Sequence, residues 1–254
     1  MKTLRFFVTA WLVVTTTVVT ADEVRVFAAG AAKHAVEALA PAFQQATGHT
    51  LRASYDTVGA LTGRVLAAQT GEVADVVILS DNALASLAAA GRLSPQSPYS
   101  IGRVVVAVAV KQGAPLPDMS TPAALQRALL AAPSIAYGDP ARGATAGTHF
   151  AKVMAVMNLD SLLKDKITVL PFGVDVITGV AQGRYAFGIS QSSEIKQHPS
   201  VSYAGPLPAP YGLSTGYGAA LTSDSAAARQ FLTFLKDSQA MREFEASGFS
   251  QKVE

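Results

Sequence analysis

Gly30, Ala31 and Ala32 form the centre of a loop of very small residues, which could let a ligand reach the protein backbone. The loop follows a short stretch of β-favouring residues (24–27) and precedes an amphipathic stretch with helical spacing of its apolar residues. The first N–H groups of a helix have no partner within it, and the helix dipole adds partial positive charge there. The pattern therefore predicts an anion site, although the same small residues would also let an ordinary βα turn pack closely.

Four side chains with basic or titratable groups lie close to predicted helix starts. Lys33 and His34 belong to the first turn after the small-residue loop, Arg142 lies in the loop 138–147, and His149 lies one turn into the next helix. A guanidinium can bind a carboxylate through two parallel hydrogen bonds, so these residues together predict a site for a small organic polyanion. For each of them a solvated or packed structural role is the alternative. The helix N-termini that would complete the site lie near Ala32, Thr57, Gly147 and Val174.

The sequence offers little support for metal or cofactor chemistry. It contains no cysteine, which excludes disulfides, thiolate metal sites and a cysteine nucleophile. No histidine pair has the spacing of a metal site, and the glycine-bearing loop 138–143 lacks the Gly-Lys-Ser/Thr sequence of a phosphate-binding loop. We therefore expect neither a metal ion nor a cofactor.

Hydrophobic patterning places the candidate residues in two series of alternating strands and helices. The predicted strands are residues 24–27, 50–55, 76–79, 103–110, 134–137, 167–170, 185–189, 201–203 and 215–221. After the helix that follows residue 32, the predicted helices are residues 60–68, 83–90, 121–130, 147–158, 174–182, 226–236 and 239–246.

Two long extended segments, 103–110 and 205–210, join the two series and predict an α/β fold of two lobes with two hinge crossings. We expect lobe 1 to comprise residues 22–104 and 211–254, and lobe 2 residues 105–210. Ligands of open α/β sheets bind beyond the carboxyl ends of the strands, so the loops of both lobes can face one cleft.

Residues 1–21 differ from the rest of the chain. Lys2 and Arg5 precede the apolar run 6–14, and small residues at 19–21 suit cleavage, so we predict a secretory signal peptide cut after Ala21, with an uncleaved anchor as the alternative. Without this segment the chain has 18 basic and 18 acidic residues. No basic stripe indicates nucleic-acid binding, and no later segment has about 18 uninterrupted apolar residues. We expect an exported protein without a membrane span, located in the periplasm of a Gram-negative source.

Five short motifs follow one another along the chain after the predicted signal peptide. They are Val26-Phe27-Ala28-Ala29, Phe43-Gln44-Gln45-Ala46-Thr47-Gly48, Ser54-Tyr55-Asp56-Thr57-Val58-Gly59-Ala60-Leu61, Ala74-Asp75-Val76-Val77-Ile78-Leu79-Ser80-Asp81, and Gly138-Asp139-Pro140 before Ala146-Gly147. In this order and spacing they resemble the motifs of the periplasmic molybdate-binding protein and its relatives. The resemblance covers nearly all of the chain after the predicted signal peptide and implies the type II periplasmic binding-protein fold.

The departures from this family concern the ligand. Relatives that bind molybdate typically place a serine in the first loop, where this chain has Gly30-Ala31-Ala32, a serine pair where it has Thr57-Val58, and a tyrosine where it has Ser190 to Glu194. Alanine and valine cannot donate hydrogen bonds to a tetrahedral oxyanion, so we expect a different anion. The ligand-binding residues that we predict are Gly30, Ala31, Ala32, Lys33, Thr57, Val58, Arg142, Ala146, Gly147, Val174, Gln191 and Ser192.

Two functions fit this sequence. The first is that of aconitate isomerase, an exported enzyme similar to molybdate-binding proteins, which moves an allylic proton between trans- and cis-aconitate. Such an enzyme would need His34 or His149 as the base and Tyr217, or else Tyr55, as the acid. The second is that of a solute receptor for an ABC importer, with an importer permease as its partner. In either case the expected ligand is a small anion, a di- or tricarboxylate rather than molybdate.

Overall fold

The computed structural model describes residues 21–68, 74–95 and 97–251. The predicted signal peptide lies outside these residues except for Ala21. Within the described ranges, no helix has the length and apolar character needed to cross a membrane.

One lobe is built on the strand order β2-β1-β3-β9. Strands β1 and β2, and β1 and β3, are parallel, whereas β9 runs antiparallel to β3. The elements of this lobe are β1 (Glu23–Ala29), η1 (Gly30–Ala32), α1 (Lys33–Thr47), β2 (Thr50–Asp56), α2 (Val58–Ala67), β3 (Val76–Ser80), α3 (Asp81–Ala89), β9 (Ser214–Leu221), α9 (Ala226–Phe234) and α10 (Ser238–Ala246).

The other lobe continues the sheet in the order β4-β7-β5-β6, with β8 paired to β4. Strand β5 is parallel to both β6 and β7, and β4 is antiparallel to β7. Its elements are β4 (Tyr99–Lys111), α4 (Pro122–Ala131), β5 (Ile135–Gly138), η2 (Pro140–Arg142), α5 (Thr145–Val156), α6 (Asp160–Leu163), η3 (Lys164–Lys166), β6 (Ile167–Leu170), α7 (Gly173–Ala181), β7 (Phe187–Gln191), α8 (Ser192–Lys196) and β8 (Val201–Pro206).

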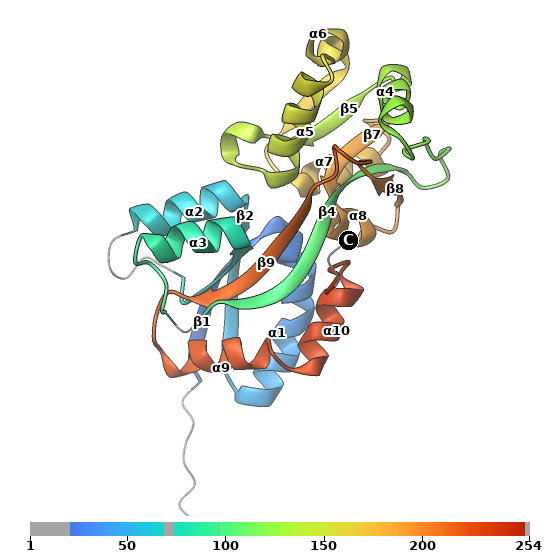
Figure 1. The fold of residues 1–254 in the computed structure, drawn as a ribbon. Coiled ribbons are helices and arrows are strands. Elements are labelled where there is room, and N and C mark those ends of the chain that lie inside the picture. Colours follow the sequence, from blue (N-terminus) through green and yellow to red (C-terminus); the bar gives the residue numbers. More distant parts are fainter. Residues whose placement is uncertain (1–20, 69–73, 96, 252–254) are drawn as a thin grey trace, which may run out of the picture.

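Strands β4 and β9 connect the two lobes, and Figure 1 shows them side by side as they run from the lower lobe to the upper one. The first half of β4 pairs with β9, up to Val105, and its second half pairs with β7 and β8. The chain therefore crosses between the lobes on extended segments, as predicted, and the two-lobed α/β fold is confirmed.

Each lobe has its own hydrophobic core. In the first lobe, Phe43 of α1 is fully buried and contacts Phe231 and Phe234 of α9 edge-on, with ring centroids 5.0 and 5.5 Å apart. In the second, Tyr137 of β5 packs on Phe150 of α5 at 5.4 Å. The core clusters do not mix residues of the two lobes. The division at residues 104 and 210 stays a prediction.

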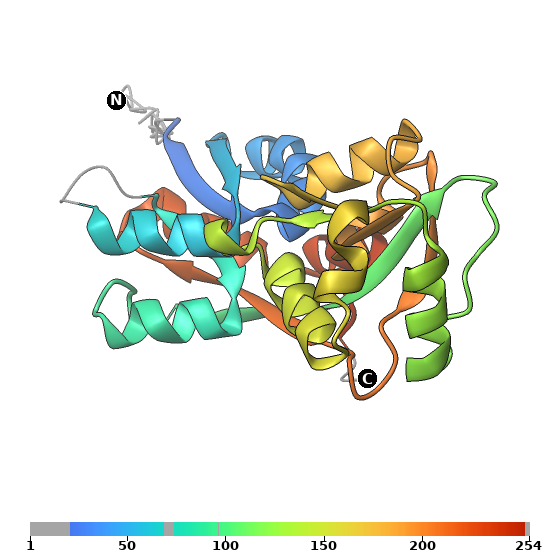
Figure 2. The same cartoon turned by 90° about the horizontal axis from the view of Figure 1, so that it is seen from above.

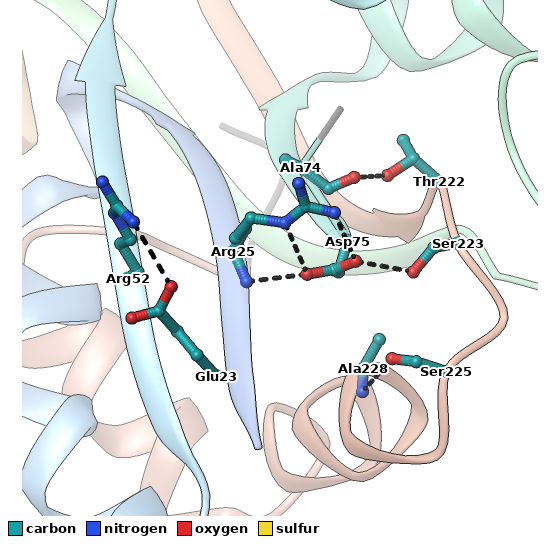
Figure 3. A network of polar contacts seen from close by, with 9 residues as sticks. All are labelled: Glu23, Arg25, Arg52, Ala74, Asp75, Thr222, Ser223, Ser225 and Ala228. Atoms are coloured by element: carbon teal, nitrogen blue, oxygen red, sulfur yellow. Dashed lines mark hydrogen bonds and ion pairs between the residues drawn. The ribbon is translucent and has the colours of Figure 1, made fainter. Parts of the chain in front are cut away.

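A network of polar contacts links three segments of the first lobe near the amino end of β1 (Figure 3). The backbone N–H of Arg25 donates to Asp75 at 2.9 Å, its guanidinium pairs with the same carboxylate at 3.3 Å, and Ser223 donates to it at 2.9 Å. Partial burial acts to raise the pKa of Asp75, but these hydrogen bonds and the charge of Arg25 outweigh it and hold the pKa below its usual value. Asp75 thus joins β1, β3 and the turn after β9.

Most predicted elements agree with the structure to within a few residues. The structure adds the short helices α6 and α8, begins α5 at Thr145 rather than at Gly147, and extends β7 to Gln191. A helix of five residues, such as α8, is too short to show an amphipathic repeat in the sequence. This omission matters because α8 lies between the two lobes, where it packs against η1.

Candidate functional site

A cavity of about 330 Å³ lies between the lobes, and both lobes contribute to its wall. The first lobe contributes the junctions β1–η1–α1 and β2–α2 together with Tyr217 of β9. The second contributes the first residues of α5 and α7 and the junction between β7 and α8. The cavity therefore lies beyond the carboxyl ends of β1, β2, β5 and β7, as the connectivity predicts.

Three helix starts face this cavity without a side-chain cap. They are η1 leading into α1, α5 with Ala146 and Gly147 in its first turn, and α7 beginning at Gly173. Gly147 is required for packing, because a Cβ there would lie 1.7 Å from the carbonyl oxygen of Gly138. The free N–H groups of these helix starts can donate to an anion in the cavity.

Gln191 and Ser193 add buried polar groups to the cavity wall. Both residues line the cavity and are 4% and 1% exposed, respectively. The hydroxyl of Ser193 has no hydrogen-bond partner in the described part of the chain, whereas the amide of Gln191 faces the backbone N–H of Glu194 in the capping box of α8 and interacts with Tyr217. Since buried polar groups are nearly always hydrogen-bonded, the hydroxyl of Ser193 favours a polar ligand at this position.

Glu194 is an acidic group in the cavity wall, at the third residue of α8. The hydroxyl of Ser190 donates to its Oε2 atom in a short hydrogen bond, and the backbone N–H of Gln191 lies 3.4 Å from the same oxygen. Burial raises the pKa of Glu194, and the two hydrogen bonds offset this only in part. No salt bridge to Glu194 is present among the described residues.

Tyr217 lies beside Glu194 and is 1% exposed. Burial raises the pKa of Tyr217, the negative charge of Glu194 raises it further, and interactions with Thr145 and Gln191 lower it in part. The phenol therefore stays protonated and can donate a hydrogen bond. Its ring is fixed by an edge-on contact with Phe249 at 5.8 Å.

The charged groups at the cavity are of both signs. Lys33 and His34 lie on α1, and the ammonium of Lys33 is 3.9 Å from Glu37 and 5.6 Å from the ring centre of Tyr55. Burial, together with the charge of Glu37, raises the pKa of Tyr55. His34 is exposed. The cavity thus has the ammonium of Lys33 at its α1 side, close to the carboxylate of Glu37, and the acidic group of Glu194 at α8.

Arg142 does not line the cavity, contrary to the prediction. Its guanidinium lies 3.0 Å from the carboxylate of Asp56 and 4.9 Å from the ring centre of Phe172. Its carbonyl oxygen accepts a short hydrogen bond from the Thr57 hydroxyl, and the N–H of Gly59 donates to Gly143 at 3.2 Å. Figures 1 and 2 show the η2 turn close to α2. Arg142 therefore joins the two lobes outside the cavity wall, and its binding to a carboxylate stays a prediction.

His149 also lies outside the cavity wall. A ring nitrogen of His149 is 2.7 Å from the carbonyl oxygen of Tyr211, on the segment that returns to β9. The residues of α5 that line the cavity are Thr145, Ala146 and Gly147 of its first turn, and His149 lies one turn further along the helix. The role of His149 that the geometry supports is a contact with the return segment.

Ala32 and Ser192 are two further predicted ligand-binding residues that do not line the cavity. Ala32 is buried behind the cavity wall, and the hydroxyl of Ser192 accepts a hydrogen bond from the N–H of Val105 at 3.2 Å. The predicted site residues that do line the cavity are Gly30, Ala31, Lys33, His34, Thr57, Val58, Ala146, Gly147, Val174, Gln191 and Tyr217.

Glu194, Ser190 and Ser193 are cavity residues that the sequence prediction missed. Gln191 and Glu194 have the three-residue spacing of a capping box, which could have indicated a helix start after β7. That signal predicts a helix but does not say that its acidic residue faces a cleft.

One other sequence pattern has a structural explanation. Residues 212–216 match the nucleophile-elbow pattern Gly-x-Ser-x-Gly, but Ser214 begins a strand instead of a strand-to-helix turn. Its hydroxyl accepts a hydrogen bond from Arg103 at 3.0 Å, and Ser214 is not among the residues that line the cavity. This serine lacks the setting of a nucleophile.

Comparison with known proteins gives consistent matches. The family described as "Bacterial extracellular solute-binding protein" matches residues 24–250. An aconitate isomerase from Pseudomonas sp. is 32% identical over 232 residues, which cover 88% of this chain and 86% of that protein.

Solved structures show the same fold at lower identity. The periplasmic molybdate-binding protein of Azotobacter vinelandii superposes with a TM-score of 0.73 at 21% identity, over 91% of this chain and 100% of that one. The sulfate-binding protein SubI of Mycobacterium tuberculosis superposes with a TM-score of 0.65 at 19% identity, over 90% and 86% of the two chains.

Proposed function

Because the chain belongs to the bacterial extracellular solute-binding protein family, we propose that it binds a small polycarboxylate between its lobes and interconverts trans- and cis-aconitate. The observation that carries the proposal is the composition of the cavity wall. Uncapped helix starts and the buried polar groups of Gln191 and Ser193 meet there with the acidic group of Glu194 and the protonated phenol of Tyr217.

The wall is suited to a carboxylate more than to a tetrahedral oxyanion. The hydroxyls of Thr57 and Ser190 line the cavity, but they already donate hydrogen bonds to the carbonyl oxygen of Arg142 and to the carboxylate of Glu194, respectively. A carboxylate on the wall also repels an anion that stays fully ionised. A polycarboxylate can instead place its charged groups at the helix starts and near Lys33, away from Glu194.

The reaction needs no cofactor. A base removes a proton from the methylene carbon, the electron pair spreads over the allylic system and its carboxylates, and a proton returns to the other terminal carbon. Donors aimed at those carboxylates stabilise the charge that develops between the two steps. The similarity to an aconitate isomerase at 32% identity supports this reaction over simple binding.

The test is to incubate the purified protein with trans-aconitate and follow cis-aconitate by NMR. We expect turnover to equilibrium from either isomer. A Gln191→Ala variant should lose affinity for trans-aconitate, whereas Gln45→Ala, on the exposed side of α1, should not. Strong thermal stabilisation by molybdate without turnover of aconitate would contradict the proposal.

A solute receptor is the second candidate function. The family match and the two-lobed cleft favour it, since domain closure around a ligand is how such receptors act. Its partner would be an ABC importer permease. Tight binding of trans-aconitate without formation of cis-aconitate would select this alternative.

We further propose that the chain acts after export, in the periplasm of a Gram-negative source. The predicted signal peptide and the extracellular description of the family support this location. Sequencing the N-terminus of the protein from its native host tests the location. A mature protein that begins at Asp22 is the expected result, and a retained Met1 would contradict it.

A further inference from the structure

We propose that Glu194 is the base that takes the proton from the bound ligand and returns it. The inference rests on the proposed isomerase function and assigns the proton transfer to a residue that the sequence prediction did not include. His34 is exposed and His149 lies outside the cavity wall, so neither predicted histidine has the position that Glu194 has.

The first argument is position. The carboxylate of Glu194 lies between two backbone segments of opposite lobes, at Gly30 of η1 and at Gly173 of α7. A Cβ built on Gly30 would lie 2.8 Å from Oε1, and one built on Gly173 would lie 2.3 Å from Oε2. Both segments are helix starts that can bind carboxylates of the ligand, so Glu194 would lie beside the carbon chain that links them.

The second argument is the asymmetry of the two carboxylate oxygens. Oε2 accepts hydrogen bonds from Ser190 and from the N–H of Gln191, whereas Oε1 accepts none from the described residues. The hydrogen bonds fix the orientation of the group and leave a lone pair of Oε1 available. A base held in this way can approach a C–H bond without first breaking a hydrogen bond.

The third argument is the set of groups around it. The titratable and charged groups that face the cavity with Glu194 are Lys33, His34 and Glu37 of α1, Tyr55 and Asp56 of β2, His198 after α8, and Tyr217 of β9. Lys33 is near Glu37 and Asp56 is paired with Arg142, and none of the ion pairs between described residues includes Glu194. Burial makes the carboxylate a stronger base than it is in water.

The proton transfer is balanced within one carboxyl group. Oε1 forms an O–H bond as the methylene C–H bond breaks, and the electron pair moves into the allylic system. The O–H bond then breaks as a C–H bond forms at the other terminal carbon, and Glu194 returns to the carboxylate form. Tyr217 is protonated and lies close by, so it can donate a hydrogen bond to a ligand carboxylate that gains negative charge between the two proton transfers.

The test compares Glu194→Gln with the wild type and with Glu245→Gln, a matched control on an exposed position of α10. We expect Glu194→Gln to lower turnover by a factor of about 10² to 10⁴ while trans-aconitate still binds and the protein still melts cooperatively. In deuterium oxide, the wild type should exchange the methylene hydrogens of the ligand, and Glu194→Gln should not. Glu194→Asp should recover part of the rate.

The outcomes separate the two proposals. If the wild type neither isomerises aconitate nor exchanges its hydrogens, the proposed function fails. If the wild type isomerises aconitate and Glu194→Gln keeps more than about a tenth of the rate, Glu194 is not the base and the isomerase function stands.

Discussion

Asp75 and Glu194 are acidic residues near opposite ends of β1, and they differ in their hydrogen-bond partners and in the direction of their pKa shifts. Asp75, at the amino end, is paired with Arg25 and has a lowered pKa (Figure 3). Glu194, next to the loop that follows the carboxyl end, accepts hydrogen bonds from only a hydroxyl and one N–H group of the described residues and has a raised pKa. A carboxylate that serves the fold has its charge compensated, whereas one available for chemistry does not.

The largest effect that would test this comparison is on stability. We expect Asp75→Asn to lower the free energy of unfolding by about 1–3 kcal/mol, because hydrogen bonds to a charged group are lost and Arg25 loses its partner. Glu194→Gln should leave stability unchanged or raise it, because a poorly compensated charge is removed. Urea denaturation at neutral pH measures both. If both variants lost stability equally, the two carboxylates would have the same role.

A second prediction concerns the position of the Glu194 carboxylate. Gly173→Ala places a methyl group 2.3 Å from Oε2 of Glu194 and 2.6 Å from the hydroxyl of Ser190, so the Glu194 carboxylate and the hydroxyl that holds it must both move. We expect turnover of aconitate to fall by about tenfold or more, since a small displacement of a reacting group is costly.

The control for this variant is Gly63→Ala in α2, where a Cβ would meet no atom within 4 Å. The helix should be stabilised by about 0.5–1 kcal/mol with no change in turnover. Equal rates in the two glycine variants would show that the position of the Glu194 carboxylate does not control the reaction.

The pH dependence of stability should differ in sign for the two residues. The pKa of Asp75 is lowered by folding, so its contribution is present above the ordinary aspartate value and is lost as pH falls through the folded-state pKa. The pKa of Glu194 is raised, so its contribution is present below the ordinary glutamate value and is lost as pH rises through the folded-state pKa.

Glu194→Gln should therefore gain stability relative to the wild type as pH rises from about 4 towards 8. Denaturation curves across this range measure the difference between the two proteins. A difference that does not change with pH would mean that the pKa of Glu194 is the same in the folded and unfolded chains.

The comparison also shows what the sequence can and cannot predict. Local signals were sufficient for the buried strand β3 and for the helix start near Thr57, where the Thr57 hydroxyl accepts a hydrogen bond from the N–H of Ala60, because both depend on neighbouring residues. The two-lobed fold followed from the order of strands and helices. These features are properties of short stretches of chain.

The site depends on contacts between distant residues, which single-sequence patterns do not contain. Arg142 was predicted to bind a ligand, but it pairs with Asp56, 86 positions earlier in the chain. His149 was predicted to face the ligand, but it lies outside the cavity wall. The part of a helix that faces a cavity depends on how the helix packs. Glu194 was missed because its exposure to the cavity is set by η1 and α7, which belong to other parts of the chain.

The smallest predicted effect concerns the contact between the lobes. Arg142 lies 3.0 Å from Asp56, with side chains 40% and 20% exposed, and the pair joins the lobes beside the cavity. An ion pair of this exposure contributes about 0–1 kcal/mol, so we expect Arg142→Gln to weaken binding of trans-aconitate by no more than about fivefold. The loss should shrink at high salt.

Arg229→Gln is the matched control, because Arg229 pairs with Asp224 within one lobe at 2.6 Å. Its loss should not change affinity, since breaking that pair leaves the contact between the lobes intact. Calorimetric titration of both variants at low and high salt separates the effects. If both arginine variants bound trans-aconitate as the wild type does, the Arg142–Asp56 pair would not contribute to the closed, ligand-binding form. Closure would then depend on the backbone contacts at Gly59 and Gly143, which no change of side-chain charge removes.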